Sequence, residues 1–302
     1  MKQPSFLKKG DTIAIIAPSS PAPLNKIEAG FSYLESWGLN VLEGKYIRDS
    51  YGSLAATDEQ RLEDIQWAFD HPEVKAVLCT RGGYGLTRIL DQIDMTKFVE
   101  NPKWLIGFSD ITALHYKINS ENVQSLHACM LAQMGLEDSL PSRENLKQFL
   151  FGEGLEPLLA EASPLNRIGS AQGVVVGGNL ALVNDQVGSL VDIDMKGKIL
   201  FIEEIGEYRY TIDRMMTHLK RCGKLDHLAA LVIGQITDTR KNDENEFPLT
   251  PEEIITEKVK EFDYPVAFNF AIGHEQPNYP LVLGCEISIE VNESGSILSH
   301  LS

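Results

Sequence analysis

The first half of the chain alternates short apolar runs with longer segments in which apolar residues recur at helical spacing. The apolar runs are bounded by Gly, Pro and charged residues, as strands are. We predict strands at 12–17, 39–44, 75–79 and 103–108. We predict helices at 26–37, 58–70 and 86–93. Such alternation favours a parallel sheet with helices on both faces, which is a Rossmann-like or flavodoxin-like domain.

This alternation ends in a stretch rich in Pro, Gly, Ser and charge between residues 137 and 170. We therefore expect an N-terminal domain at 1–150, a linker at 151–172 and a C-terminal domain at 173–302. The second half holds more apolar strand-like runs than the first. They lie within 171–183, 197–204, 227–236, 266–273 and 282–291, with helices at 210–220 and 250–262. The fold class predicted is α/β, with a smaller strand-rich α/β domain after the parallel-sheet domain.

Composition mainly excludes classes of partner. The 302 residues carry a formal net charge of −16, whereas nucleic-acid binders concentrate Lys and Arg. No apolar run reaches the roughly 18 residues of a membrane span, and the N-terminal MKQPSFLKKGD has no apolar region after its lysines. The four cysteines form no C-x-x-C pair. We expect a cytoplasmic protein with no nucleic-acid or membrane partner, no metal and no cofactor.

Ser109 lies in WLIGFSDITALH, where an apolar strand gives way to a helix. Serine is a preferred helix N-cap, and the Asp110 carboxylate would complement the positive helix end, so capping alone explains both residues. The same turn would present the hydroxyl at the sheet edge, with the next backbone N–H directed at a developing oxyanion. Ile111 occupies the position of the last glycine in the G-x-S-x-G motif of α/β-hydrolases, so that fold is not indicated. The two interpretations of Ser109, as a cap and as a nucleophile, are compatible.

The segment TRGGYG, residues 80–85, follows a predicted strand. It is too short for the G-x-G-x-x-G fingerprint of dinucleotide-binding proteins and lacks the lysine of a P-loop. Glycines there either let the backbone approach a ligand closely or serve only a tight turn. The segment alone leaves both interpretations open.

Acidic residues and one histidine follow strands of the second half. Glu203, Glu204 and Glu207 leave the apolar run in LFIEEIGE, either as an exposed strand end or as paired carboxylates. His274 comes directly after a predicted strand, and it and His127 are the histidines not assigned to polar faces, the helix after Ser109 or the terminus. The sequence HEQPN lacks the second histidine of H-E-x-x-H, so a zinc peptidase motif is not indicated.

Taken in order, these segments resemble the L,D-carboxypeptidase family of serine peptidases. The resemblance spans nearly the whole chain. It rests on GDTIAIIAPSSP, RGGYG, GFSDITALH, GGNL, LFIEEIGEYRYTIDRMMTHL and GHEQPNYPLVLG. One departure is HACM at 127–130, where the family has HGPM.

The resemblance implies a cytoplasmic enzyme, often a homodimer, that removes the terminal D-alanine from murein tetrapeptides in cell-wall recycling without a metal. It assigns Ser109 as nucleophile, His274 as general base and Glu203 as the carboxylate that orients the imidazole. Glu204 and Glu207 remain alternatives for that acid. Serine needs such a base, and the base needs an acceptor at its other nitrogen.

The resemblance also implies an oxyanion hole formed by the backbone N–H of Asp110 and of a glycine in RGGYG, for which we choose Gly83 over Gly82. The leaving D-alanine carries a carboxylate, for which we expect Arg81 as partner. Because the nucleophile and the other two residues come from different halves, the active site is expected where the domains meet.

Three other functions are considered. A relative within the family cleaves microcin C-type peptide–nucleotide conjugates and confers self-immunity, but the connection at 137–172 has no Trp or Tyr for base stacking. A non-catalytic sensor of murein peptides would need no nucleophile and base. A dehydrogenase would need a glycine fingerprint that the chain lacks.

Overall fold

The computed structural model describes residues 1–240 and 247–301, and the chain divides into two compact units. Unit 1 comprises Met1–Leu155 and Gln276–Gly284, and unit 2 comprises Glu156–Glu275 and the chain from Cys285 onward. The structure thus assigns 276–284 to the first unit, whereas the sequence pattern assigned it to a domain at 173–302. The segment predicted as a linker, 151–172, contains a strand and the start of another. The reason is tertiary, because 276–284 contributes a strand to the sheet of unit 1.

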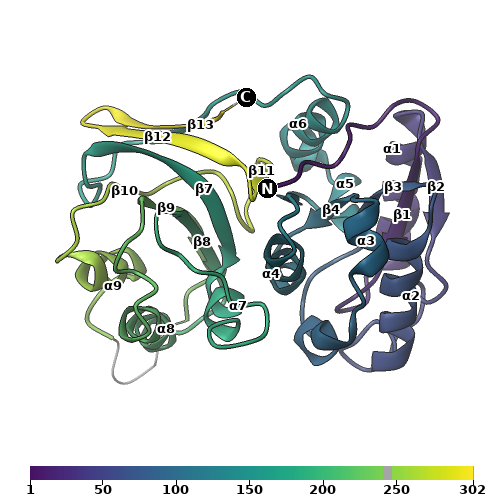
Figure 1. Ribbon diagram of the computed structural model, residues 1–302, viewed down its shortest axis with the longest axis horizontal. Coiled ribbons are helices and arrows are strands. Elements are labelled where there is room, and N and C mark those ends of the chain that lie inside the picture. The colour runs from purple at the N-terminus through teal and green to yellow at the C-terminus, as the bar shows by residue number, and fades with distance from the viewer. Residues whose placement is uncertain (241–246, 302) are drawn as a thin grey trace. The chain divides into compact units, whose positions relative to one another are not determined.

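The sheet of unit 1 has the strand order β11-β5-β4-β3-β1-β2 (Figure 1). Its strands are β1 (Thr12–Ile16), β2 (Asn40–Glu43), β3 (Val74–Cys79), β4 (Trp104–Gly107), β5 (Ser125–His127) and β11 (Leu281–Leu283). Strands β1 to β5 pair in parallel and β11 pairs antiparallel to β5. The chain reverses its direction of travel across the sheet between β1 and β3. In open parallel sheets, ligands bind beyond the carboxyl ends of the strands at such a point.

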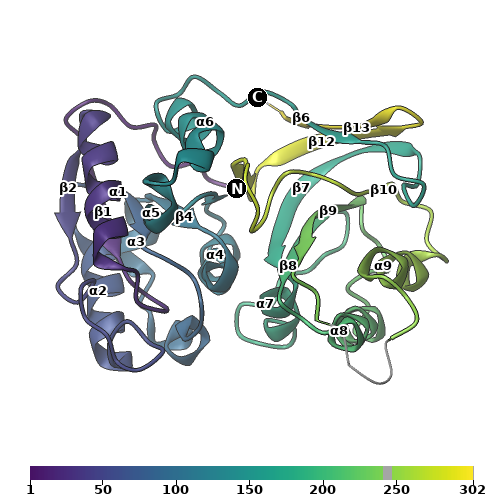
Figure 2. The same ribbon diagram turned by 180° about the vertical axis from the view of Figure 1, so that it is seen from behind.

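Helices of unit 1 pack around this sheet. They are α1 (Leu24–Ser36), α2 (Asp58–Asp70), α3 (Thr96–Glu100), α4 (Thr112–Ser120), α5 (Leu131–Met134) and α6 (Leu140–Leu150), with short 3₁₀ turns η1 (Leu86–Arg88), η2 (Leu90–Gln92), η3 (Ser109–Ile111) and η4 (Glu137–Ser139). Helix α2 occupies the predicted residues because Thr57 and Gln60 form a capping box at its start. Helices α1 and α5 lie side by side (Figure 2), and a Cβ on Gly30 would come within 2.5 Å of Leu131.

The predicted helix at 86–93 is wrong. The segment forms η1 and η2, in which Ile89 N–H donates to the Leu86 carbonyl and Gln92 N–H to the Ile89 carbonyl. Such i to i+3 bonds define 3₁₀ turns. The Leu86 N–H itself donates to the Asp110 carboxylate at 3.0 Å, so a tertiary bond holds the segment where it starts.

Unit 2 contains a mixed sheet with the order β10-β9-β8-β7-β12-β13-β6. The strands are β6 (Leu158–Glu161), β7 (Gly169–Asn179), β8 (Ile199–Ile205), β9 (Ala230–Thr237), β10 (Val266–Ala267), β12 (Glu286–Asn292) and β13 (Gly295–His300). Strands β7 to β10 are parallel, whereas β12, β13 and β6 continue the sheet in antiparallel fashion. The α/β class predicted from the sequence is confirmed. The run predicted as one strand at 282–291 is divided at Gly284 between the two units.

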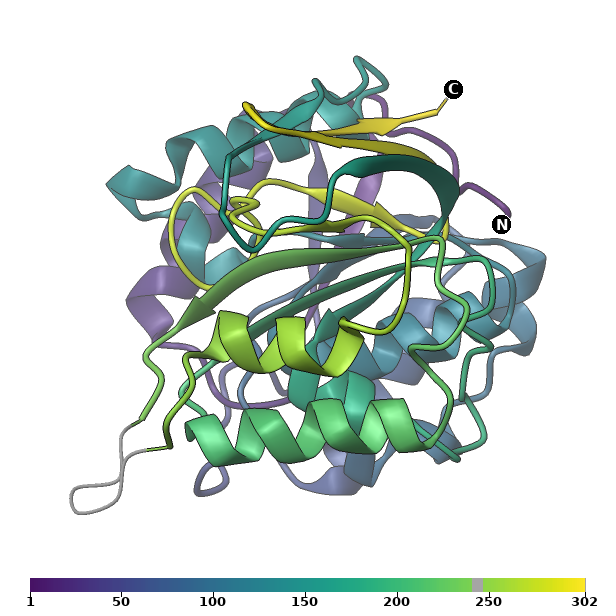
Figure 3. The same ribbon diagram turned by 90° about the vertical axis from the view of Figure 1, so that its left-hand side faces the viewer.

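The helices of unit 2 are α7 (Leu180–Asp185), α8 (Arg209–Arg221) and α9 (Pro251–Val259). Helices α8 and α9 lie side by side below the strands of unit 2 in Figure 3. The apolar residues of α8 that are buried are Ile212, Met215, Met216 and Leu219, which recur at the helical period. Among the described residues, no helix is both long and apolar enough to cross a membrane.

Candidate active site

Ser109 is the first residue of η3 and is separated from the end of β4 by one residue, Phe108. Its φ is 64°, in the left-handed region. In the described part of the chain it caps no helix, because the N-cap residues of η3 and α4 are Phe108 and Ile111, and neither makes a side-chain capping hydrogen bond. The predicted capping role is therefore wrong, since an N-cap residue is extended rather than left-handed. A side chain in this region costs about 1–2 kcal/mol and persists where the surroundings hold it, often at functional sites.

Two glycines of the TRGGYG segment pack closely against serines: Gly82 against Ser109 in this turn, and Gly83 against Ser20. A Cβ on Gly82 would lie 2.9 Å from Ser109 Cβ and 3.1 Å from Ser109 Oγ. Gly83 has a φ of +112°, and a Cβ there would lie 2.2 Å from Ser20 Oγ. Close approach to two serines therefore requires both glycines.

The peptide between these glycines has a defined orientation. Ser20 N–H donates to the Gly82 carbonyl at 3.2 Å. A trans peptide directs its carbonyl and its N–H to opposite sides, so the Gly83 N–H points away from the Ser20 backbone. Arg81, one residue earlier, is exposed, and its guanidinium donates to the Pro21 carbonyl at 3.3 Å.

In unit 2, Glu203 and His274 form a pair. The Glu203 side chain on β8 is fully buried, and its Oε2 lies 2.7 Å from Nδ1 of His274. Strand β9 has one extra residue opposite Glu203, a bulge at 234–235. Bulges redirect side chains beside functional sites. A Cβ on Gly234 would lie 2.2 Å from the Ile272 carbonyl, so only glycine lets the chain before His274 pack against β9.

Gln235, in the same bulge, fixes the loop on both sides of His274. Its N–H donates to the Ile272 carbonyl at 2.9 Å, and its Oε1 accepts from the Glu275 N–H at 2.7 Å. Burial lowers the pKa of His274, but the hydrogen bond and charge of Glu203, with the charge of Glu204, outweigh burial and raise this pKa above its ordinary value.

Glu204 points to a different set of partners. Its carboxylate accepts hydrogen bonds from Asn179 Nδ2, Ala181 N and Ile205 N at 3.0, 2.8 and 2.8 Å, so it holds the start of α7. Burial and the neighbouring Glu203 charge raise the pKa of Glu204 to about 7. Glu203 and Glu204 are 0% and 3% exposed, so of the two alternatives, an exposed strand end or paired carboxylates, the first is wrong for both. Glu207 is half-buried.

We expect Glu204→Gln to change two pH dependences. Folded Glu204 holds its proton to about pH 7, above the unfolded value, so wild-type stability falls as pH rises between those values. The Tm of the variant should therefore rise relative to wild type between about pH 5 and about pH 7. Loss of the charge should also lower the His274 pKa and move the acid limb of kcat/KM to lower pH.

Glu290→Gln is the matched control for both measurements, because Glu290 is an exposed carboxylate on the sheet of the same unit. It should leave the pH profiles of Tm and kcat/KM unchanged. Parallel Tm curves for wild type and Glu204→Gln across this range would show that Glu204 does not titrate there.

A second serine–histidine pair lies in unit 1, and the sequence did not indicate it. His115 Nδ1 is 2.9 Å from Ser125 Oγ, and His115 Nε2 is 2.9 Å from the Gly107 carbonyl. A carbonyl only accepts, so Nε2 carries the proton and Nδ1 accepts from Ser125. Both side chains are 0% exposed, and burial lowers the pKa of His115 to about 4. This pair is neutral and inaccessible to a peptide, so it braces the end of β4.

Other candidate positions are structural. His127 is buried in β5, where it pairs with Gly107 and Leu281. The departure at HACM also acts through packing, because Ala128 and Cys129 are 0% exposed. Within residues 1–240 and 247–301, no group of three or more His, Cys, Asp or Glu side chains is arranged to hold a metal ion.

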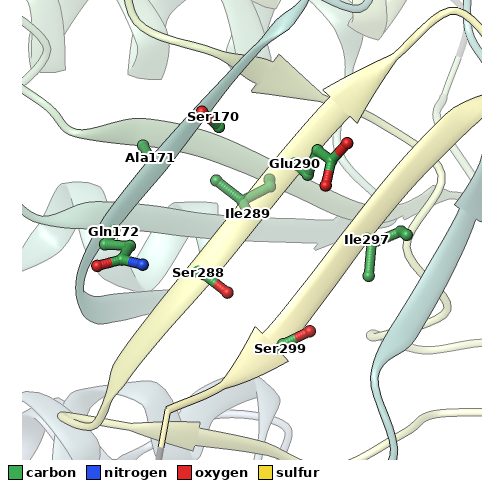
Figure 4. A pocket seen from close by; sticks show the side chains of 8 residues that line it. All are labelled: Ser170, Ala171, Gln172, Ser288, Ile289, Glu290, Ile297 and Ser299. Carbon is green, nitrogen blue, oxygen red and sulfur yellow. The ribbon is translucent and has the colours of Figure 1, made fainter.

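A shallow trough of about 460 Å³ lies on the sheet of unit 2 (Figure 4). Strands β7, β12 and β13 supply its lining, which includes Ser170, Gln172, Ser288, Glu290 and Ser299. Figure 4 shows these side chains along neighbouring strands. The lining residues include no histidine, so a base that could activate these serines is not among them.

Comparison with known proteins assigns this two-unit α/β fold to a class. Residues 13–128 match the LD-carboxypeptidase N-terminal domain, and residues 172–289 match the LD-carboxypeptidase C-terminal domain. The protein belongs to the LD-carboxypeptidase family of serine peptidases.

Two relatives and one solved structure illustrate this membership. A Bacillus subtilis protein named "probable murein peptide carboxypeptidase" is 36% identical, covering 98% of this chain and 94% of its own. The murein tetrapeptide carboxypeptidase of Pseudomonas aeruginosa is 30% identical over 93% of each chain. The crystal structure of an MccF-like protein from Bacillus anthracis matches with a TM-score of 0.87 at 25% identity, covering 100% of both chains.

Proposed function

We propose that this protein is a serine carboxypeptidase that hydrolyses the L,D-peptide bond before the terminal D-alanine of murein tetrapeptides during cell-wall recycling. The observation that carries the proposal is the 2.7 Å hydrogen bond between Glu203 and His274 in a chain of this family. It provides an imidazole whose Nδ1 is held by a buried carboxylate, the arrangement that a serine nucleophile needs. The left-handed turn at Ser109 supports the assignment of the nucleophile.

In the proposed mechanism, Ser109 Oγ attacks the carbonyl carbon of the scissile bond and gives its proton to His274 Nε2. The negative oxygen accepts hydrogen bonds from the backbone N–H of Asp110 and of Gly83. The C–N bond then breaks, and His274 returns the proton to the amine of the leaving D-alanine. Water attacks the acyl ester in the same way, which releases the tripeptide and restores the Ser109 hydroxyl. The proposal requires that Ser109 of unit 1 and the pair of unit 2 act on one substrate.

The test is detection of D-alanine by mass spectrometry after incubation with a murein tetrapeptide. The matched control substrate is the same peptide ending in L-alanine, which should release far less. Release of D-alanine from the first peptide supports the proposal. If D-alanine is not released although Ser109 reacts with a fluorophosphonate, the substrate assignment is wrong and the serine nucleophile stands.

Arg81→Ala is expected to raise KM for the tetrapeptide about tenfold and to change kcat little. The reason is that an exposed guanidinium beside Gly82 can bind the carboxylate of D-alanine in ground state and transition state alike. Steady-state kinetics measure both constants. Arg88→Ala is a matched control, since Arg88 is exposed and pairs with Asp58. An unchanged KM would show that Arg81 does not bind the substrate carboxylate.

Cleavage of a peptide–nucleotide conjugate is the second candidate activity, because the fold matches an MccF-like protein over its whole length. It would use the same three residues. Competition between the tetrapeptide and an aminoacyl sulfamoyl nucleoside would separate the two substrates by their kcat/KM values. A sensor without catalysis would bind the tetrapeptide and leave it intact.

A cytoplasmic location and a homodimer complete the proposal, as both are implied by the family. Sedimentation equilibrium would give the mass in solution. A monomer at micromolar concentration would contradict the proposed homodimer.

A further inference from the structure

We propose that the buried side chains of Asp110 and Arg61 are positioning residues that hold the glycine segment at 82–85 against Ser109. This inference rests on the proposed function in one respect, that Ser109 is the nucleophile. It concerns the side chain of Asp110, whereas the mechanism uses only its backbone N–H. We refer to these two side chains and the loops they join as the clamp.

The carboxylate of Asp110 joins two loops of unit 1. It is 2% exposed, and its Oδ2 accepts from Ser19 Oγ at 2.6 Å and from Leu86 N at 3.0 Å. Ser19 lies in the loop after β1 and is 0% exposed, and Leu86 follows the glycine segment after β3. Hydrogen bonds to an ionised group are roughly twice as strong as neutral ones. One carboxylate beside Ser109 thus fixes the loop after β1 and the loop after β3.

Arg61 donates hydrogen bonds to backbone carbonyls of the same two loops. This guanidinium, 1% exposed on α2, donates from one nitrogen to the carbonyls of Pro18 and Gly85, the latter at 2.9 Å. Pro18 precedes Ser19, and Gly85 precedes Leu86. Each loop is therefore held once by an acceptor from Asp110 and once by a donor from Arg61.

The clamp would keep the strained backbone at Ser109 in place. Ser109 has a φ of 64°, and a strained residue keeps its conformation only where neighbours determine it. Gly82 touches Ser109, and the Gly83 N–H is a proposed donor to the oxyanion. Holding Leu86 and Gly85 thus sets the position of Gly83 relative to Ser109. An error of about 1 Å in such a distance costs about 100-fold in rate.

The test is Asp110→Asn, compared with Asp64→Asn as a matched control. Asp64 is also buried, at 4% exposure, and its carboxylate accepts from Lys45 N and Tyr46 N to anchor the loop after β2. Two readouts are used: kcat and KM for D-alanine release, and the rate of Ser109 labelling by a fluorophosphonate. Asp110→Asn should lower kcat and the labelling rate about 100-fold with little change in KM. Asp64→Asn should lower Tm only.

Ser19→Ala removes one bond of the clamp and no charge, so it serves where Asp110→Asn fails to fold. It should lower the labelling rate about tenfold. A wild-type labelling rate in folded Asp110→Asn would overturn the inference. If Asp110→Asn does not fold, a wild-type labelling rate in Ser19→Ala would overturn it. If the wild-type protein is labelled but releases no D-alanine, the proposed substrate fails and the labelling rates still decide the clamp. A wild-type protein that is neither labelled nor active would overturn both.

Discussion

Replacing Ser109 with alanine is expected to reduce D-alanine release from a murein tetrapeptide by about 10⁶-fold, the loss seen when a serine nucleophile is removed from a triad. The fold should persist, because alanine keeps the Cβ that already occupies the left-handed turn at φ 64°. The loss should therefore appear in kcat at an unchanged Tm. Mass spectrometry of D-alanine and fluorophosphonate labelling measure it in two independent ways.

Ser125→Ala is the matched control, since the Ser125 hydroxyl lies 2.9 Å from the imidazole of His115. Its removal leaves Nδ1 of His115 without the Ser125 hydroxyl and should cost about 1–3 kcal/mol of stability. Labelling of Ser109 should continue in this variant. If Ser125→Ala abolished labelling and Ser109→Ala did not, the nucleophile would be misassigned.

Glu203→Gln is expected to lower kcat by about 10⁴-fold, the loss found when a triad carboxylate loses its charge. Glutamine has nearly the same shape as glutamate, so the variant removes the charge of residue 203 and keeps the shape of its side chain. Among the described residues, Oε1 of Glu203 has no hydrogen-bond partner, so an amide NH₂ placed there breaks no existing bond. The imidazolium that forms during catalysis would then lack its counter-charge.

Stability should respond to the same substitution in a pH-dependent way. The folded pKa of His274 is raised, so its stabilising contribution is complete below the unfolded pKa and is lost as pH rises through the folded value. Glu203→Gln removes this contribution. The Tm deficit of the variant should be largest below the ordinary pKa of histidine and should shrink as the pH rises through the raised pKa of His274.

Glu204→Gln is the control for this prediction, because Glu204 is an adjacent buried carboxylate whose partners are Asn179 and backbone N–H groups. It should keep most of kcat on the alkaline plateau. Equal losses in the two variants would mean that the orientation of His274 does not depend on Glu203.

Local patterns were sufficient where local forces decide the structure. Strand β1 and helix α2 follow from apolar periodicity and, for α2, from a capping box four residues long, so their prediction is confirmed. The same patterns failed at 86–93, where the Asp110 carboxylate takes the first N–H. They failed again at 282–291, where a single apolar run serves two units.

In the candidate site, too, some features follow from local sequence patterns and others from tertiary contacts. The sequence by itself determined the α/β class, the family and the strand-to-helix position of Ser109, because each depends on residue types in order along the chain. Only the tertiary structure decided that Ser109 is not a cap, that Glu203 rather than Glu204 meets His274, and that Gly82 touches Ser109. These depend on φ angles and on contacts between residues far apart in the chain, which burial and hydrogen bonding fix only when the chain has folded.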